Sequence, residues 1–459
     1  MNDGKVTFNV LASIEKHIEG LKPLLPKQAL VCIGEYPIKT ILKEPIITKE
    51  IALPILIEKS SDEIYKWLPK SYDAHFVLGF EEEHIDTHFW YNVLPTISKD
   101  NSVMESLRKK FVEKLHSAII FSSVWEGVGS ASLPAFIRKF KEAKIDSLSI
   151  VVLPSKIQPP DAHFNACGAL ETCLATDGAT VLLLERDQIE SYEGVDRKGE
   201  PIKGNMVANY LLNMFLAKNL LVEEIAELSR TFNIKLFTAL LVTGSSYNIF
   251  GSLDNMLNAA LLKPLLKSDL PNASLLYVLL RMPLTLKDIL PRSKIEVTIT
   301  NWFKEKTSLQ SIYITEPIYT KDMTDRIDAV LLIGGFEATK MLSEMETRVK
   351  SLKDRAVERG FITEDWKVVS KFEVSQNIDE ILEVSEPPKA EESEIVTEEA
   401  MNEEPKKVNS TEGLGETTIV EPANSVGEPK IAEEPKIGEE PKRARRTKKT
   451  VTKNLNEEK

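Results

Sequence analysis

The sequence predicts an α/β protein with a parallel sheet in its first half, a long central helix, an α+β C-terminal domain and a disordered tail. Short apolar segments alternate with amphipathic segments over roughly the first 200 residues, as in sheets with helical crossovers. A mainly apolar stretch at 204–228 is typical of a buried helix. The last aromatic residue is Phe372, and few large apolar residues follow it.

Residues 116–154 form the clearest unit of the predicted sheet. An apolar strand at 116–123 precedes an amphipathic helix at 132–143, and a second apolar strand follows at 147–154. We expect Pro134 in the first turn of that helix, where its missing N–H costs nothing. Two apolar strands joined by one helix indicate a parallel pair with a crossover connection.

The same alternation surrounds this unit. We expect strands at 28–34, 51–57 and 178–185, and helices at 102–116 and 162–175. The apolar stretch 204–228 is expected to be a buried helix that ends or kinks near Leu220.

A second block of elements follows the central helix. It is predicted to hold one helix and three strands in antiparallel or mixed order, at 255–266, 273–283, 311–319 and 326–336. Residues 294–303 are rich in β-branched side chains, which favour a strand. Ile295, Ile299 and Phe303 recur at helical spacing, however, and we expect a helix there. Residues 338–359 are predicted to form a charged helix that leaves the folded body.

The C-terminal tail is predicted to be disordered from about Asp379, because its composition cannot bury enough apolar surface to offset ordering. Six of the eight residues in Lys442–Lys449 are basic. Two interpretations stay open: a solvated tail that keeps the protein soluble, or a tether whose cationic end contacts an anionic partner.

Composition narrows the class of protein. The net charge of -12 and pI of about 5.3 argue against a general nucleic-acid binder. Three cysteines, Cys32, Cys167 and Cys173, show no close metal-ligand pair and are typical of a reducing compartment. No segment resembles a signal peptide or an uninterrupted membrane span. We therefore expect a cytoplasmic protein that is not integral to a membrane.

Gly127 and Gly129 are predicted to lie in a turn between the strand at 116–123 and the following helix. The chain lacks the spacing of a P-loop, and Ser132 replaces the third glycine of a dinucleotide fingerprint. Close backbone approach, the hydroxyls of Ser130 and Ser132 and the N–H groups of the helix could hold a phosphate. Glu126 opposes this, and a plain tight turn is the alternative.

The order of these pieces resembles the tubulin/FtsZ superfamily, on the FtsZ side, from about residue 28 to 337. The glycine-rich phosphate signature of that family lies on 125–134, where Gly127 and Gly129 match and Ser130 stands for threonine. The first phosphate loop of the family falls on 33–41, which keeps only Gly34. The resemblance implies GTP or GDP as cofactor. Both loops have lost glycines, so loss of this cofactor is the alternative.

The resemblance also implies roles for individual residues. Asn209 takes the place of the family's residue that reads the guanine base, with a polar residue facing a loop as the alternative. Glu224 and Glu227 take the places of two acidic residues that activate water on the nucleotide of the next subunit. A solvated face of a helical turn is the alternative for both. Asp322, Met323 and Arg326 match a pattern in the family's C-terminal domain.

The implied domains are a nucleotide-binding domain at 1–203, a central helix and loop at 204–228 and a C-terminal domain at 229–340, followed by a charged helical extension and the tail, 341–378 and 379–459. The first hypothesis is a GTP-binding cytoskeletal protein that associates into filaments, with weak or absent GTPase activity. The second is a non-hydrolysing FtsZ-like structural or regulatory partner of a division or cytoskeletal system, which the lost glycines favour. A dinucleotide-dependent oxidoreductase is the third, and the missing ribose-binding acid argues against it.

Overall fold

The structure is a computed structural model, and it describes residues 27–43, 52–69, 76–80, 85–110, 115–218, 220–267, 273–306, 311–336 and 339–362. All of these lie in one compact unit, Met1–Glu386. The predicted disordered tail from Asp379, including the basic run, falls outside the described residues.

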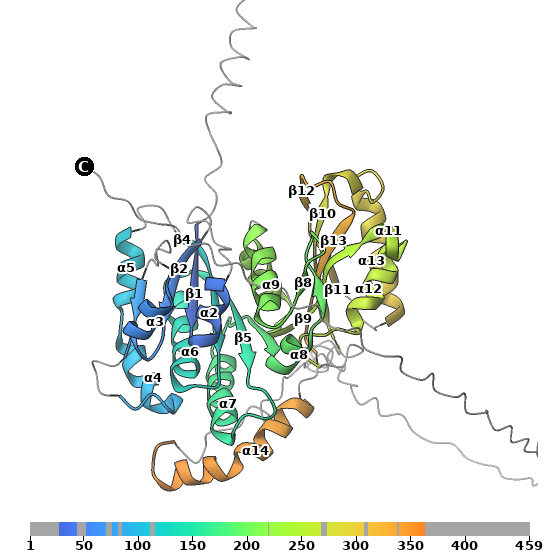
Figure 1. The fold of residues 1–459 in the computed structure, drawn as a ribbon. Helices are drawn as coiled ribbons and strands as arrows, with labels where there is room; N and C mark the ends of the chain where they lie inside the picture. Colours follow the sequence, from blue (N-terminus) through green and yellow to red (C-terminus); the bar gives the residue numbers. More distant parts are fainter. Residues whose placement is uncertain are drawn as a thin grey trace, which may run out of the picture. The chain divides into compact units, whose positions relative to one another are not determined.

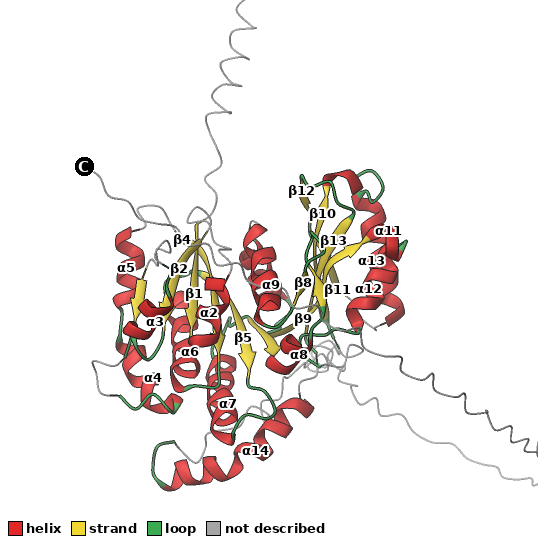
Figure 2. Cartoon of the chain, in the orientation of Figure 1, coloured by secondary structure: helices red, strands yellow, loops and turns green. Residues whose placement is uncertain are grey.

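One large sheet organises the described chain (Figures 1 and 2), with the strand order β11-β10-β13-β9-β6-β5-β4-β1-β2-β3 and β12 paired with β10. Its first six strands are all parallel to their neighbours: β1 Lys27–Ile33, β2 Ala52–Ile57, β3 Phe76–Leu78, β4 Leu115–Ser123, β5 Asp146–Leu153 and β6 Val181–Glu185. The parallel arrangement was predicted, whereas the short strand β3 was not.

Helices cover both faces of this parallel part because its strands are apolar on both sides. On β1, Ala29, Val31 and Ile33 pack into one core cluster, whereas Leu30 and Cys32 pack into another. The first cluster includes side chains of α4 Trp90–Lys99, α5 Ser102–Lys110, α6 Gly127–Glu142 and α7 Pro160–Ala175. The second includes side chains of α2 Glu35–Lys43 and α3 Ser61–Trp67.

The central apolar stretch forms two helices, α9 Asn205–Ala217 and α10 Leu221–Thr231. The break falls at Leu220, whose φ of 60° is left-handed, so the predicted interruption near this residue is confirmed. Both helices pack into the second core cluster. A short helix, α8 Arg186–Ser191, and the hairpin β7 Gly194–Val195 and β8 Pro201–Ile202 precede α9.

The C-terminal block is mixed, as predicted. Its strands are β9 Leu236–Ser246, β10 Leu275–Pro283, β11 Ser311–Ile314, β12 Ile318–Thr320 and β13 Arg326–Gly334, and its helices are α11 Tyr247–Phe250, α12 Leu253–Leu261 and α13 Arg292–Lys306, with a 3-10 turn at Leu284–Leu286. The last helix, α14 Thr339–Glu358, packs against α7 and buries Leu342, Met345 and Val349, so the prediction that it leaves the folded body was wrong. β9 joins the two parts of the sheet, because it is parallel to β6 and antiparallel to β13. The helix expected at 294–303 is confirmed by α13.

Several predicted boundaries were wrong. The helix expected at 102–116 is α5, which ends at Lys110, and Leu115 already begins β4. The segment 311–319 forms two short strands rather than one. Pro134 lies inside α6 rather than in its first turn, because the helix begins at Gly127. β9 was not predicted, since threonine, glycine and serine interrupt the apolar pattern in its second half.

A buried ionic network connects the central helix to the C-terminal strands. The carboxylate of Asp328 is fully buried and accepts hydrogen bonds from Arg281 Nε at 2.7 Å, Tyr210 OH at 2.9 Å and the Gly244 N–H at 2.6 Å. Arg197, between β7 and β8, lies 3.6 Å from the same carboxylate and also binds Asp322. The buried carboxylate of Asp328 therefore has both hydrogen-bond donors and cationic partners.

No helix among the described residues is long and apolar enough to cross a membrane.

Candidate functional site

The parallel part of the sheet has a switch point between β1 and β4. The strand order runs outward through β2 and β3 on one side and through β5 and β6 on the other, so the connections leave these two neighbours in opposite directions. Loops after the carboxyl ends of strands at such a point are the usual ligand site of open α/β sheets. Here they are Gly34, which follows β1, and 124–126, which follows β4.

Gly34 makes a tight turn into α2. Its φ is +92°, a conformation that favours glycine, and an added Cβ would lie 2.6 Å from Ser123 Oγ. Its N–H donates to Ile57 O, and its own carbonyl accepts from the Ile38 N–H. The residue therefore has a structural reason to be glycine that does not require a ligand.

Gly127 and Gly129 do not lie in the expected turn, because α6 begins at Gly127 and includes both. An added Cβ at Gly127 would lie 2.3 Å from Thr87 O, and one at Gly129 would lie 1.9 Å from Ser123 O. Both glycines are buried. The space that a side chain would take at these two glycines is thus filled by the chain's own backbone.

The two serines also face the protein. Ser130 and Ser132 are fully buried, and Ser130 Oγ donates to Val124 O at 3.0 Å. Ser132 Oγ has no hydrogen-bond partner among the described residues. Ser122 Oγ donates to Gly129 O at 3.2 Å. The hydroxyl of Ser130 was expected to bind a phosphate. It instead donates a hydrogen bond to the turn before α6.

Aromatic side chains gather across the switch point. The ring centroids of Tyr36, on α2, and Trp125, after β4, are 5.5 Å apart in an edge-to-face arrangement. Tyr36 also contacts Phe121, and burial raises the pKa of its phenol above the usual range. The guanidinium of Arg186, at the start of α8, lies 5.1 Å from the Trp125 ring centroid. These contacts join three of the loops at this edge of the sheet.

Carboxylates surround the same loops. Glu58, directly after β2, is 1% exposed, and burial first, then the charges of Glu126 and Glu63, raise its pKa to about 7 against the backbone N–H and charge of Lys59. Glu126 directly precedes α6 without a side-chain capping hydrogen bond. Burial raises its pKa as well, against the charge of Lys59 and with the charges of Glu35 and Glu63 adding to the rise. Glu58 is therefore partly protonated near pH 7, and the negative charge that remains near the loops disfavours a bound phosphate.

Asn209 lies in α9, and its amide is already engaged. It is 4% exposed, and its Nδ2 donates to Thr40 O on α2 at 2.9 Å. Its Oδ1 accepts from Asn213 at 3.5 Å. The side chain thus links two helices of the same core cluster.

Glu224 and Glu227 lie on α10, away from the switch point. Arg230 of this helix binds Asp146, the first residue of β5, so α10 reaches the amino edge of the sheet. Glu224 accepts a hydrogen bond from Tyr277 OH at 2.7 Å, and Glu227 is exposed. The structure therefore does not bring these carboxylates together with Gly34, Gly127 and Gly129 in one copy of the chain.

Two features of the switch point escaped the sequence analysis. Glu58 is one; its only signal was a charged residue that directly follows an apolar strand. The other is Asn165 on α7, whose amide donates to His88 O at 2.9 Å and Trp125 O at 3.4 Å. These hydrogen bonds fix the loop that contains Trp125, directly before α6. Nothing in the sequence around Asn165 indicated this role.

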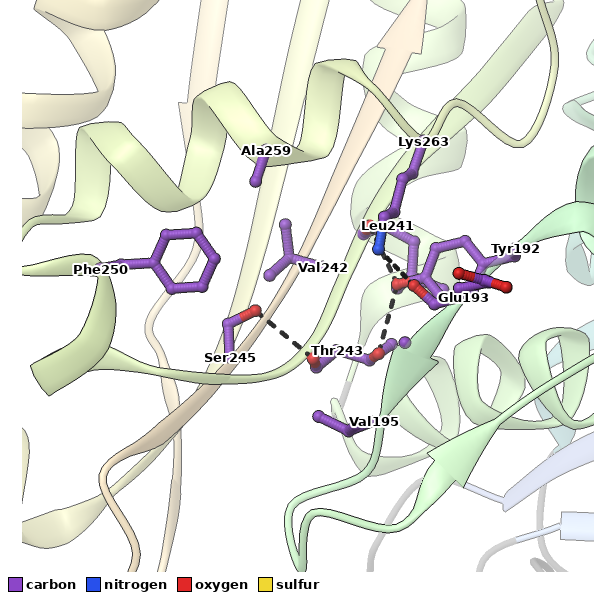
Figure 3. A pocket seen from close by; sticks show the side chains of 11 residues that line it. Tyr192, Glu193, Val195, Leu241, Val242, Thr243, Ser245, Phe250, Ala259 and Lys263 are labelled. Carbon is purple, nitrogen blue, oxygen red and sulfur yellow. Dashed lines mark hydrogen bonds between the residues drawn. The ribbon is translucent and has the colours of Figure 1, made fainter. Parts of the chain in front are cut away.

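A separate cavity of about 320 Å³ lies between the β7 strand, β9 and α12 (Figure 3). Apolar side chains such as Val195, Leu241 and Phe250 line it, and Lys263 reaches over the ring of Tyr192 at one end. None of the predicted site residues lines this cavity.

No protein-family profile matches the sequence, and no curated protein does. Solved structures do match. CetZ1 from Haloferax volcanii, a GDP-bound monomer, is similar with a TM-score of 0.57 and 14% identity over 72% of this chain and 100% of that one. CetZ2 from Haloferax volcanii, a GTPγS-bound protofilament, is similar with a TM-score of 0.55 and 15% identity over 72% and 99%.

A dimeric, empty FtsZ from M. jannaschii is also similar, with a TM-score of 0.51 and 16% identity over 70% of this chain and 92% of that chain. The protein therefore has the tubulin/FtsZ fold, and the predicted resemblance is confirmed at the level of the fold. The solved structures that share this fold include CetZ proteins and an FtsZ.

Proposed function

We propose that this protein is a tubulin/FtsZ-like cytoskeletal subunit that assembles with copies of itself or with a filament-forming partner, and that does not hydrolyse GTP. One observation carries the proposal: Tyr36, Trp125 and Arg186 pack together across the switch point of the sheet. Two of these residues stand where the family's phosphate loops would be. Relatives by fold have been solved as protofilaments, which supports assembly.

Loss of the GTP or GDP cofactor is part of this proposal. A guanine nucleotide would need backbone N–H groups at Gly34, Gly127 and Gly129, donors at Ser130 and Ser132 and a free amide at Asn209. Gly127 and Gly129 face the chain's own backbone, Gly34 faces the hydroxyl of Ser123, and the amide of Asn209 donates to Thr40 O. In their ionised forms, nearby Glu58 and Glu126 would also repel a polyphosphate, although burial raises the pKa of both groups.

A GTP-dependent filament is the second candidate. It is favoured by the position of α10 toward the amino edge, opposite the loops at the carboxyl edge. In a head-to-tail filament, Glu224 and Glu227 of one copy would then meet the switch point of the next, as catalysis between subunits requires. In this candidate GTP or GDP is the cofactor and GTPase activity is weak.

The implied domains and location complete the proposal. The nucleotide-binding-type domain spans 1–203, the central helix and loop 204–228, and the C-terminal domain 229–340, with the extension and tail behind them. Cys32, Cys167 and Cys173 are free and buried, which is consistent with a cytoplasmic protein.

Sedimentation of the full chain separates the two candidates. We expect the same pelleted fraction with and without GTP and Mg²⁺, and no phosphate release above a buffer blank. Glu227→Ala should then leave pelleting unchanged. GTP-dependent pelleting, with phosphate release that Glu227→Ala abolishes, would support the second candidate and reject the first.

A further inference from the structure

We propose that the cavity between β7, β9 and α12 binds a small apolar monocarboxylate. We call it the hairpin cavity, because Tyr192, Gly194 and Val195, at and just before the β7–β8 hairpin, form one of its walls. The proposal goes beyond the proposed function and does not depend on it, since none of the residues assigned to the switch point lines this cavity.

The hairpin cavity has the size and the lining of a small-molecule site. Its volume of about 320 Å³ falls within the range of such sites, near the lower end. Val195 of β7, Val242 of β9, Phe250 of α11 and Ala259 of α12 line it with apolar groups (Figure 3). An apolar body that enters would leave water for contact with these side chains, which is favourable.

The wall between the hairpin and β9 is closely packed. Tyr192 OH donates to Leu241 O at 3.2 Å and lies 3.2 Å from Thr243 Oγ1. An added Cβ at Gly194 would lie only 2.4 Å from Thr243 Oγ1, so no larger side chain fits there without a shift. This wall is therefore formed before any ligand arrives, which lowers the cost of binding.

One cation lies at the rim of the hairpin cavity. Lys263 is exposed, its Nζ donates to Glu193 O, and it lies 5.6 Å from the Tyr192 ring centroid. No carboxylate of the described residues forms an ion pair with it, and the group that it contacts on Glu193 is the main-chain oxygen. An ammonium group has three N–H donors, so two remain for a ligand.

These features select the charge of the ligand. An apolar interior with a single cation at its rim favours a molecule with an apolar body and one anionic end. A carboxylate fits this end, because it accepts charge-assisted hydrogen bonds from an ammonium group. A molecule of the same shape with a cationic end would instead be repelled by Lys263.

Ligand-observed NMR titration of the full chain tests the proposal with octanoate, octanol and octylammonium, which share one alkyl chain. We expect saturable binding of octanoate, about threefold to fivefold weaker binding of octanol, and the weakest binding of octylammonium. A factor of this size is what an exposed charge pair contributes. Equal binding of the three molecules would overturn the choice of a carboxylate.

A first variant removes the cation. Lys263→Gln should abolish the preference for octanoate over octanol while leaving the binding of octanol unchanged. Lys294→Gln is the matched control, because Lys294 of α13 is also an exposed lysine that donates to a backbone carbonyl, Ile289 O at 3.2 Å. A preference that survives Lys263→Gln, or that Lys294→Gln abolishes equally, would overturn the role of Lys263.

A second variant fills the cavity. Ala259→Phe adds a ring from α12 and should abolish saturable binding of octanoate and octanol alike, with circular dichroism to check that the chain is folded. Octanoate should also raise the unfolding midpoint of the parent chain, because a ligand that binds only the folded state stabilises it. Should Ala259→Phe not fold, the comparison at Lys263 decides alone. No saturable binding of octanoate to the parent chain, or binding that a folded Ala259→Phe retains, would overturn the proposal.

Discussion

Two buried carboxylates, Asp328 in the C-terminal sheet and Glu58 at the switch point, differ in their partners. Asp328 is fully buried and receives hydrogen bonds from Arg281, Tyr210 and Gly244, with Arg197 nearby. Glu58 is almost as buried, yet one of its oxygens has no partner among the described residues, and its pKa rises to about 7. A buried carboxylate whose oxygens all have partners stabilises the fold. A buried carboxylate with an unpartnered oxygen lowers the stability of the fold when it is ionised.

Removing Asp328 is expected to have the largest effect. Asp328→Ala leaves Arg281 as a buried cation without its carboxylate and should lower the free energy of unfolding by about 3–5 kcal/mol. Denaturant unfolding measures this. Asp288→Ala, at an exposed position, should stay within about 0.5 kcal/mol of the parent chain. Equal losses in the two variants would contradict the role given to the network.

Removing the charge of Glu58 is expected to have the opposite sign. Its pKa is raised from 4.5 to about 7 in the folded state, so the folded protein binds this proton more tightly and loses stability as pH rises from 4.5 to 7. Glu58→Gln should therefore stabilise the protein by up to about 3 kcal/mol at pH 8 and by little at pH 4.5.

Unfolding midpoints at the two pH values check this prediction. Glu63→Gln is the matched control on α3, because its side chain is partly exposed. A destabilised Glu58→Gln at pH 8 would show that this carboxylate has a partner after all.

The two serines of α6 give the smallest and most local test. Ser130→Ala should cost about 1 kcal/mol, because Val124 O loses its donor. Ser132→Ala should cost little or nothing, since its hydroxyl has no partner among the described residues. A larger loss at Ser132 would show that its hydroxyl has a partner, and unfolding midpoints resolve the difference.

The sequence predicted the architecture well because strand and helix periodicity are local. The parallel strands of the first half, the break at Leu220 and the helix at 294–303 all follow from short patterns of apolar residues. β9 was missed because threonine, glycine and serine interrupt the apolar pattern in its second half, although nearly all of its residues are buried.

The candidate site could be predicted only in part. The sequence predicted close backbone approach at Gly127 and Gly129. Only tertiary contacts show that Thr87 and Ser123 occupy the space beside them. Tyr36 and Trp125 lie in the two segments, 33–41 and 125–134, that were matched to the family's phosphate loops, but the sequence did not indicate that they would meet across the switch point. Glu58 was not predicted, because its burial depends on elements far apart in the chain.

The central claim is that the switch point of this tubulin/FtsZ-like fold no longer holds a guanine nucleotide. The most direct test is to denature the purified full chain and quantify the released nucleotide by chromatography, followed by titration of the native protein with GTP and Mg²⁺. The account predicts no released guanine nucleotide and no saturable binding up to millimolar GTP. About one GTP or GDP released per chain would contradict it.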